Sequence, residues 1–407
     1  MKKILLLALF AALTAFGCEA GNGADDTPQE PTEQNPDNPG ESEGDEGEEG
    51  GEGEEPEQPE QPDEDDPAGG EEEEEPAVDK VEDKMPDLPF DYDWVIVAAD
   101  GTGDYKTVTE ALRSISGNKY HIVHIRPGIY YEKINMNKNR VILYGDDPET
   151  TILTYDDYAG KLKSNNTQLG TQDSYSFAVN AQEFVAINIT FQNTHVNDPN
   201  NGIKDNQAVA VGVFQDRAAF YNCRLTGYQD TFYPKNEARV YCKDCYIEGN
   251  VDFIFGDAAL LCENCTLCAN RDDSPITAPS TSLKNPFGFV FMDCRITSVD
   301  GKDFNGNDIT RIYLGRAWKE GARAVYIRCE EPANLSPDGW RSRMSEDAVE
   351  ALFAEYRCTG EGASEERLAQ RKNNGRQLTD DEAAEYTRTN IFTRNGTEWV
   401  PMEPFEL

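Results

Sequence analysis

Short apolar segments separated by polar turns dominate the chain from residue 90 onward. Asp93–Ala98 and His121–Ile125 have the length and β-branched composition of strands. No stretch between residues 120 and 330 has the long 3.6-residue period of an amphipathic helix. The pattern therefore predicts a body made mostly of short strands.

Helical patterns occur at three places. Residues 108–115 follow Thr107 and Glu110, whose spacing is typical of a helix N-terminus. Asp347–Tyr356 and Asp380–Tyr386 are also predicted to be helical, and the second of these opens with capping-box spacing. We expect the two C-terminal helices to cap and flank the strands and not to form a separate domain.

A four-residue unit recurs along the strand-rich region. It consists of Asn or Asp, then Cys, any residue and an aliphatic residue, and the steps between its cysteines are 22, 20 and 29 residues. Its four copies are Asn222–Leu225, Asp244–Ile247, Asn264–Leu267 and Asp293–Ile296. Short strands at a period near 20 residues predict a solenoid of stacked coils, the right-handed parallel β-helix.

The cysteines admit a second interpretation. Cys242 and Cys245, followed by Cys262 and Cys265, match a four-thiolate zinc template. However, each cysteine of the first pair lies 20 residues before its counterpart in the second, which is one coil. Ladders of small buried side chains also account for Cys223 and Cys294, which a zinc site does not. We favour ladders and expect few or no disulfides.

The first 17 residues have the pattern of an export signal. Two lysines precede an apolar run from Ile4 to Phe16, which is too short to span a membrane as a mature helix. The run ends at Gly17-Cys18, which resembles a bacterial lipobox with Cys18 as the lipidated residue. Ala15 and Phe16 depart from the usual box, which leaves ordinary secretory cleavage as the alternative.

Residues 18–88 differ sharply in composition from the rest. They hold 30 acidic and two basic side chains, rich in Glu, Gly and Pro, within a chain of net charge −40. Such a segment cannot bury enough apolar surface to fold, so we expect a disordered tether. Residues 89–407 carry a net charge of −14 and form one expected domain. Because the chain has no basic face, no nucleic-acid partner is expected.

Two pairs of polar residues share the coil period. Gln207 and Gln229 are 22 residues apart, and so are Asp230 and Asp252. If the coils stack, each pair occupies adjacent strands about 4.8 Å apart. Two neighbouring carboxyl groups beside two amides could supply a nucleophile, a proton donor and oxyanion-binding N–H groups. On spacing alone, structural Gln and Asp ladders explain the pattern equally well.

A set of motifs resembles the pectin methylesterases. The motifs, in the order found in that family, are Gly128–Glu132, Gln207-Ala-Val-Ala, Gln229-Asp230-Thr231, Asp252-Phe-Ile-Phe-Gly and Leu314-Gly315-Arg316-Ala317-Trp318. The resemblance extends over almost all of residues 93–392. It implies a parallel β-helix, in agreement with the repeat, and hydrolysis of the galacturonate methyl esters of pectin to carboxylate and methanol.

The resemblance also implies a role for each catalytic position. Asp252 matches the nucleophile, and Asp230 matches the group that acts first as general acid and then as general base. Gln207 and Gln229 match the amides of the oxyanion site. Arg316 matches the residue that orients Asp252 and is expected to lower its pKa, while Asp252 is expected to raise the pKa of Asp230.

Three further residues match the substrate-binding side of the family site. Trp318 is expected to stack on sugar, Phe253 to form apolar cleft wall, and Ser176 to replace a substrate-contacting Thr. The family's usual Leu-Gly-Arg-Pro-Trp has Ala317 in place of Pro, which is expected to loosen that turn. The expected partner is methyl-esterified homogalacturonan, with no cofactor and no metal.

The alternatives are distinct in chemistry. A pectate lyase would need a calcium site and an Arg base, and a polygalacturonase would need clustered Asp residues with a Gly-His-Gly, which the three histidines of this chain do not form. A non-catalytic pectin-binding protein and an acyl thioester hydrolase on the same fold stay open. We expect a monomeric outer-membrane lipoprotein of a Gram-negative bacterium, in contact with membrane only through the lipid on Cys18.

Overall fold

The computed structural model describes residues 87–197, 202–346, 348–349 and 351–406. The predicted signal peptide, the lipidation site at Cys18 and nearly all of the acidic segment lie outside the described residues. Within the described part of the chain, no helix is long and apolar enough to cross a membrane.

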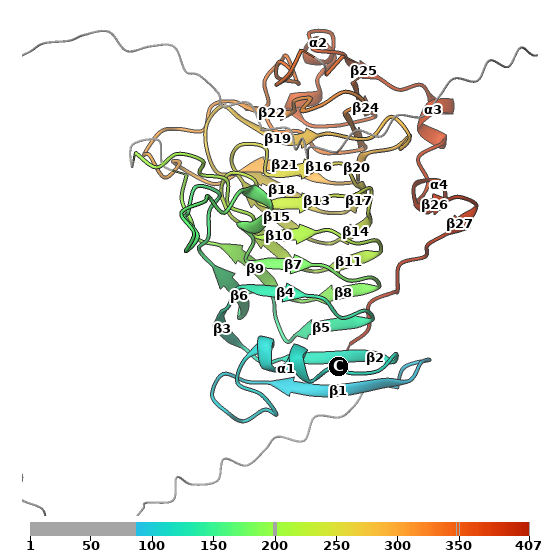
Figure 1. Cartoon of the computed structure of the whole chain (residues 1–407). Coiled ribbons are helices and arrows are strands. Elements are labelled where there is room, and N and C mark those ends of the chain that lie inside the picture. The colour runs from blue at the N-terminus through green and yellow to red at the C-terminus, as the bar shows by residue number, and fades with distance from the viewer. Residues whose placement is uncertain (1–86, 198–201, 347, 350, 407) are drawn as a thin grey trace, which may run out of the picture. The chain divides into compact units, whose positions relative to one another are not determined.

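Three parallel sheets run along the folded body, and the chain visits them in turn (Figure 1). Sheet A, in spatial order, contains β1 (Tyr92–Val97), β2 (Tyr120–Ile125), β5 (Val141–Gly145), β8 (Phe184–Ile187), β11 (Ala218–Tyr221), β14 (Arg239–Lys243), β17 (Ala259–Glu263), β20 (Phe289–Met292), β23 (Arg323–Ile327), β24 (Leu352–Tyr356) and β25 (Gly375–Gln377). Sheet B contains β3 (Gly128–Tyr131), β6 (Thr151–Tyr155), β9 (Thr190–Asn193), β12 (Arg224–Thr226), β15 (Tyr246–Gly249), β18 (Thr266–Ala269) and β21 (Arg295–Ser298).

Sheet C contains β4 (Ile134–Met136), β7 (Phe177–Val179), β10 (Val211–Val213), β13 (Phe232–Pro234), β16 (Ile254–Gly256), β19 (Ser274–Pro279) and β22 (Ile312–Gly315). In all three sheets the neighbours of a strand are its counterparts in the preceding and following coils. This arrangement is a parallel β-helix, as the repeat predicted.

The recurring Asn/Asp-Cys unit forms the turn between sheets A and B. Asn222, Asp244, Asn264 and Asp293 all have φ between 47° and 56°, the left-handed region. Asn and Asp tolerate this conformation better than other residues with a side chain, because their short polar groups bond locally. The recurring Asn or Asp therefore marks a left-handed backbone at the same place in each of these coils.

The cysteines of this unit point into the interior. Cys223, Cys245, Cys265 and Cys294 belong to the main buried cluster, and Cys242 pairs in register with Cys262 on the neighbouring strand. Burial raises the pKa of Cys223 and of Cys294, so both are neutral thiols at physiological pH. The predicted ladders are confirmed, and all nine cysteines of the described part of the chain are free thiols.

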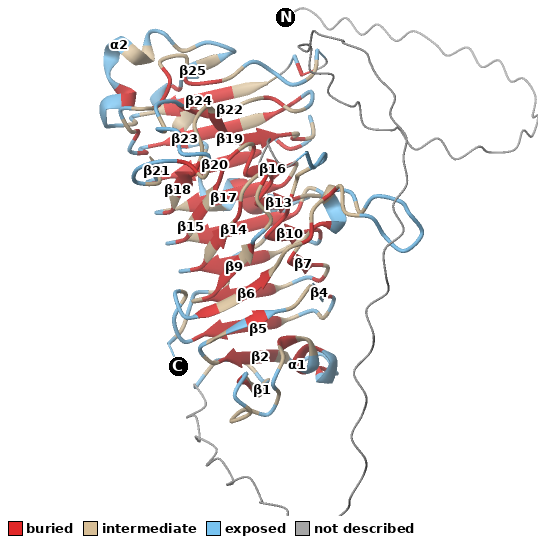
Figure 2. Cartoon of the chain, turned by 90° about the vertical axis from the view of Figure 1, so that its left-hand side faces the viewer, coloured by how far each residue is buried: buried red, intermediate tan, exposed pale blue. Residues whose placement is uncertain are grey.

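The interior is packed with residues from all three sheets, and Figure 2 shows burial following the strands from coil to coil. Phe177, Phe191, Phe220 and Phe232 form an aromatic series with ring centroids 4.9 to 6.0 Å apart. Each coil buries its apolar side chains only against the coils next to it, which is why the strands can be so short.

The helices only partly follow the prediction. Besides the 3₁₀ turns η1 (Thr171–Asp173) and η2 (Glu361–Ala363), those in the described residues are α1 (Val108–Ser114), α2 (Glu365–Leu368), α3 (Asp380–Ala384) and α4 (Arg388–Phe392). The first and third confirm the predictions at 108–115 and 380–386, and the latter has its complete capping box. The predicted helix at 347–356 is wrong, because β24 occupies Leu352–Tyr356.

The reason for that error lies in the neighbouring strand. β24 pairs with β23 and so extends sheet A by one coil, and the ring of Phe353 stacks on Trp340 with centroids 4.3 Å apart. Backbone hydrogen bonds to an existing sheet edge and a buried aromatic contact outweigh the modest helix preference of the local sequence.

The C-terminal segment, residues 379–406, runs back along the outer face of sheet A (Figure 1). It includes α3, α4 and the antiparallel pair β26 (Thr393–Arg394) and β27 (Thr397–Glu398). Its contacts move steadily toward earlier coils: Asp380 bonds Tyr356, Arg388 bonds Glu263, and Phe405 stacks near Tyr144. The segment therefore ties several coils together from outside.

Candidate active site

The two aspartates predicted to react lie at equivalent positions of adjacent coils. Asp230 lies two residues before Phe232, and Asp252 lies two residues before Ile254. Phe232 and Ile254 pair in register on β13 and β16. Adjacent strands of a sheet are about 4.8 Å apart. Both aspartates are buried, and both have left-handed backbones, with φ of 66° and 54°. Two carboxyl groups are thus carried on neighbouring left-handed turns, a backbone that Asp tolerates.

Arg316 holds one of these carboxylates in a fork. Its Nε lies 2.9 Å from Asp252 Oδ1 and its Nη2 lies 2.6 Å from Oδ2. Asp252 is only 4% exposed, so little water competes for this contact. A guanidinium stays charged and matches the carboxylate plane, so it favours the ionised, nucleophilic form of Asp252 and fixes its orientation.

The two predicted amides lie on neighbouring coils, and Gln229 immediately precedes Asp230. Gln207 precedes β10 and Gln229 precedes β13, and Ala208 N donates to Gln229 O over 3.0 Å. Gln229 Oε1 accepts a hydrogen bond from Asn197 Nδ2 over 2.9 Å. The amides, the two aspartates and Arg316 are therefore contributed by the starts of β10, β13 and β16 and the end of β22, all in sheet C.

An aromatic cluster covers the outer face of sheet C beside these groups. Tyr233 and Phe255 stack with centroids 4.0 Å apart, and the ring of Trp318 lies 6.0 Å from that of Phe255. Phe214 and Tyr175 belong to the same cluster. Flat apolar rings next to polar groups suit the alternating faces of a sugar chain.

One of the predicted substrate-binding residues does not fit its role, and another lies some strands away from the reacting aspartates. Phe253 belongs to the interior cluster between the sheets, so it cannot form cleft wall, whereas Phe255 packs in the separate aromatic cluster with Tyr233 and Trp318. Ser176 is 2% exposed and directly precedes β7, which β10 and β13 separate from β16, the strand that follows Asp252. Its Oγ is buried without a hydrogen-bond partner in the described part of the chain.

Backbone hydrogen bonds fix the turn that carries Trp318. Arg316 N donates to Thr277 O over 2.8 Å, Trp318 N donates to Pro279 O over 3.1 Å, and Ala317 O accepts from Met344 N over 2.8 Å. These three bonds fix the backbone on both sides of Ala317. The turn therefore does not depend on a proline for its shape.

Several residues of the site were not predicted from the sequence. Phe255 and Tyr233 could have been found from strand alternation, had the strand starts been known. Asn197 and Arg271 had no such signal, because they lie in turns outside the coil period. Burial lowers the pKa of Arg271, although a guanidinium keeps its charge at any physiological pH. Among the described residues, no three His, Cys, Asp or Glu side chains are placed to hold a metal ion.

Comparison with known proteins assigns the family. The sequence model described as Pectinesterase matches residues 94–395, which is most of the chain. The chain belongs to the pectinesterase family. Pectinesterase 31 of Arabidopsis thaliana is 37% identical over 303 residues, which are 72% of this chain and 90% of that relative.

Other pectinesterase relatives are much longer than the matched region. The pectinesterase/pectinesterase inhibitors 28 and 21 of Arabidopsis thaliana are 34% and 33% identical, and the match covers 75% of this chain in both cases. The matched region spans only 41% and 45% of those two proteins. The likeness therefore concerns their pectinesterase part.

Solved pectin methylesterases have the same fold. PemA from Erwinia chrysanthemi superposes with a TM-score of 0.63 at 27% identity, over 77% of this chain and 99% of that one. The carrot enzyme gives 0.62 at 30% identity, over 73% and 92% of the two chains. A pectin methylesterase in complex with a hexasaccharide gives 0.63 at 26% identity, over 76% and 98%.

Proposed function

We propose that this chain is a pectin methylesterase, a carboxylic ester hydrolase that converts galacturonate methyl esters of homogalacturonan to free carboxylate and methanol. The observation that carries the proposal is the fork between Arg316 and Asp252, with Asp230 on the next strand. It supplies an oriented, ionised carboxylate beside a second carboxyl group that can hold a proton. Membership of the pectinesterase family supports the same reaction.

In the first half of the proposed reaction, an Asp252 oxygen attacks the ester carbonyl carbon. The carbonyl oxygen becomes an oxyanion, which the side-chain amides of Gln207 and Gln229 stabilise through their N–H groups. The intermediate then expels the methoxy group, which takes the proton of Asp230 and leaves as methanol. The product is an anhydride between Asp252 and galacturonate, and Asp230 is left ionised.

In the second half, ionised Asp230 takes a proton from water while the water oxygen attacks the galacturonyl carbon. The same amides stabilise the second oxyanion. Collapse breaks the anhydride, releases the galacturonate unit as its carboxylic acid, which loses its proton to solvent, and regenerates Asp252 as a carboxylate with Asp230 protonated. The pair thus returns to its starting state, as general acid–base catalysis through a covalent intermediate requires.

The polysaccharide is proposed to lie along the aromatic cluster on the outer face of sheet C. Trp318, Phe255 and Tyr233 provide the rings, and Lys235 and Lys319 lie 5.2 and 4.8 Å from the rings of Tyr233 and Trp318. These cations would favour galacturonate units that already carry a free carboxylate. A hexasaccharide complex of a related enzyme supports an extended binding site of this kind.

The proposal is tested by following three products from highly methylated pectin, with EDTA present. Methanol release without new reducing ends or unsaturated ends is the expected result. New chain ends would point to a hydrolase or lyase acting on the backbone, and binding without any product would point to a pectin-binding protein. Thiol release from an acyl thioester, with no methanol from pectin, would favour the thioesterase alternative.

We further propose that the protein is a monomer, is exported and is anchored in the outer membrane by a lipid on Cys18. The lysines and apolar run before Cys18 support this, and the acidic segment that follows would act as a tether. Labelling with a fatty acid should mark the wild-type protein and not Cys18→Ser. Release of the unlabelled wild type into the medium would favour ordinary secretory cleavage.

A further inference from the structure

A chain of buried side-chain hydrogen bonds ends at the amide of Gln229. Asn250 Nδ2 donates to Asn197 Oδ1 over 2.8 Å, and Asn197 Nδ2 donates to Gln229 Oε1 over 2.9 Å. Asn250 is 0% exposed and Asn197 is 7% exposed. The three residues come from different coils: Asn197 follows β9, Gln229 precedes β13 and Asn250 follows β15.

The donor-to-acceptor direction of this series of hydrogen bonds is fixed at Asn250. Asn250 Oδ1 accepts from Val251 N over 2.6 Å, and a backbone N–H can only donate. Asn250 must therefore turn its Nδ2 toward Asn197. Arg271 Nη1 also lies 3.5 Å from Asn197 Oδ1, and a guanidinium can likewise only donate. Both neighbours thus require an acceptor at this position.

These contacts orient the Gln229 amide through Asn197. Because Asn197 uses its oxygen for Asn250 and Arg271, its Nδ2 faces Gln229. Gln229 accepts this hydrogen bond with Oε1, so its Nε2 points away from Asn197. For Gln207, by contrast, Oε1 is buried without a hydrogen-bond partner among the described residues, so no similar chain sets that amide.

We propose that Asn197 and Asn250 are positioning residues that hold the Gln229 amide with its N–H groups toward the oxyanion. The inference rests on the proposed function, because it assigns an oxyanion-binding role to Gln229. A reversed amide would place an oxygen where negative charge develops. Loss of one donor of an oxyanion site costs about 10²–10³ in kcat.

Asn197→Asp tests the direction of these hydrogen bonds most directly. Aspartate has nearly the same shape as asparagine and still accepts from Asn250 and Arg271, but it cannot donate to Gln229. Gln229 must then turn its Nε2 toward residue 197. We expect kcat on methylated pectin to fall about 10²–10³-fold with KM changed less than about threefold. Asn197→Ala leaves the amide free to rotate, so a smaller fall, about tenfold, is expected.

A double-mutant cycle separates positioning from general damage. If Asn197 acts through Gln229, then Asn197→Asp should cost nothing further in a Gln229→Leu background. Asn180→Asp is the matched control, because Asn180 Nδ2 also donates to another amide, Asn135 Oδ1, over 2.9 Å. Its kcat should equal that of the wild type. Thermal unfolding of each full-length variant checks that the fold is intact.

Three results would overturn the proposal: a loss in Asn197→Ala as large as in Asn197→Asp, additive losses in the cycle, or a fall expressed in KM. If the wild type itself releases no methanol, the proposed function fails separately. The side-chain amide ¹⁵N resonances of Gln229, identified by their loss in Gln229→Leu, then decide the matter. They should shift in Asn197→Asp, and unchanged resonances would contradict the inference.

Discussion

Arg316 and Asp252 are 64 residues apart in the sequence and form the closest charge pair of the site, with Arg316 Nη2 2.6 Å from Asp252 Oδ2. Arg316 follows β22 and Asp252 precedes β16, so β19 alone separates their strands in sheet C. The stacking of coils converts a long sequence separation into a fork that neither local segment could form by itself.

That fork predicts the behaviour of Arg316→Lys. Lysine keeps the charge but offers a single point contact in place of two parallel N–H groups. A hydrogen bond to a charged group contributes about 1.5–3 kcal/mol, so kcat should fall about 10–100-fold. Steady-state kinetics on methylated pectin measure this. Wild-type kcat in Arg316→Lys would mean that charge alone is enough.

The positions of Phe253 and Phe255 predict opposite effects for the same substitution. Phe253→Leu alters the interior, so it should lower the free energy of unfolding by about 1–3 kcal/mol with KM unchanged. Phe255→Leu removes the ring between Tyr233 and Trp318, so it should raise KM for pectin about threefold to tenfold. Kinetics and chemical denaturation of both variants decide the matter. A KM effect in Phe253→Leu alone would reverse the assignment.

A buried charge cluster near the C-terminal coils predicts how stability depends on pH. Arg371 Nη2 lies 2.7 Å from carboxylate oxygens of both Glu331 and Glu355, and all three side chains are at most 2% exposed. Burial and the neighbouring Glu355 raise the pKa of Glu331 far above its usual 4.5. The folded protein therefore holds a proton that the unfolded chain releases above about pH 4.5.

Stability should accordingly fall as pH rises above the unfolded pKa, by up to about 1.4 kcal/mol per pH unit from this group. Glu331→Gln cannot titrate, so its free energy of unfolding should decline less between about pH 6 and pH 9 than that of the wild type. Urea unfolding over that range measures both slopes. Equal slopes in the two proteins would show that Glu331 does not hold the proton.

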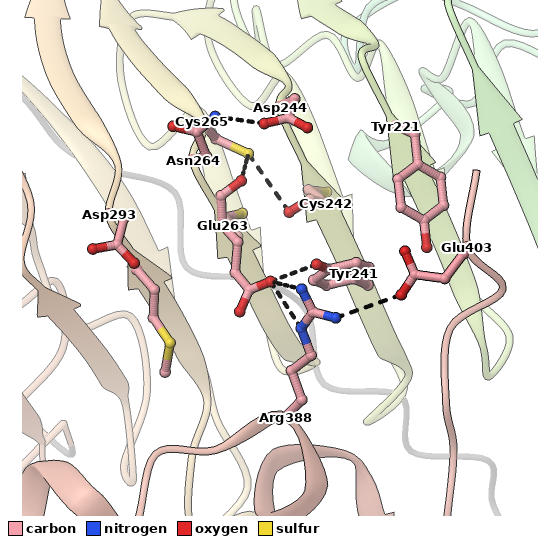
Figure 3. A network of polar contacts seen from close by, with 12 residues as sticks. Tyr221, Tyr241, Cys242, Asp244, Glu263, Asn264, Cys265, Asp293, Arg388 and Glu403 are labelled. Carbon is pink, nitrogen blue, oxygen red and sulfur yellow. Dashed lines mark hydrogen bonds and ion pairs between the residues drawn. The ribbon is translucent and has the colours of Figure 1, made fainter. Parts of the chain in front are cut away.

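The C-terminal segment predicts a residue that supports stability and not catalysis. Figure 3 shows Arg388 of α4 between Glu263 and Glu403, close to Tyr241 of sheet A. Its Nε lies 2.8 Å from Glu263, and its guanidinium lies 4.8 Å from the centre of the Tyr241 ring. Arg388→Ala should lower the free energy of unfolding by about 1–2 kcal/mol.

Because these contacts lie on sheet A, kcat should be unchanged in Arg388→Ala. Arg357→Ala is the control: Arg357 pairs with Asp380 over 3.1 Å, but both side chains are well exposed, so its effect should be below about 0.5 kcal/mol. A kcat loss in Arg388→Ala with normal stability would show that this segment influences sheet C.

The coil repeat could be predicted because it reflects a local rule. Each Asn or Asp before a ladder cysteine occupies a left-handed turn, a backbone that these two residue types favour, although Arg328 and Arg357 adopt it before Cys329 and Cys358. The same rule places Asp230 and Asp252, whose spacing of 22 residues equals the register offset of Phe232 and Ile254. Turns with a left-handed backbone can therefore be recognised in the sequence by their Asn and Asp residues.

The face of Phe253 was predicted wrongly for a related reason. The left-handed backbone of Asp252 interrupts the alternation of the strand, so counting from Asp252 does not tell which neighbour points inward. Asn197 could not be predicted at all. It lies in the loop after β9 and donates to Gln229 across 32 residues, a contact that only the folded chain creates.

The most direct test of the central claim is methanol release from highly methylated pectin by the full-length wild type and by Asp252→Asn, with EDTA present. Asparagine keeps the shape and the neighbourhood of Arg316 but is not a carboxylate nucleophile. We predict steady release by the wild type, a loss of at least about 10³-fold in Asp252→Asn, and pectin binding by both. Release by Asp252→Asn at the wild-type rate, or by neither protein, would contradict the account.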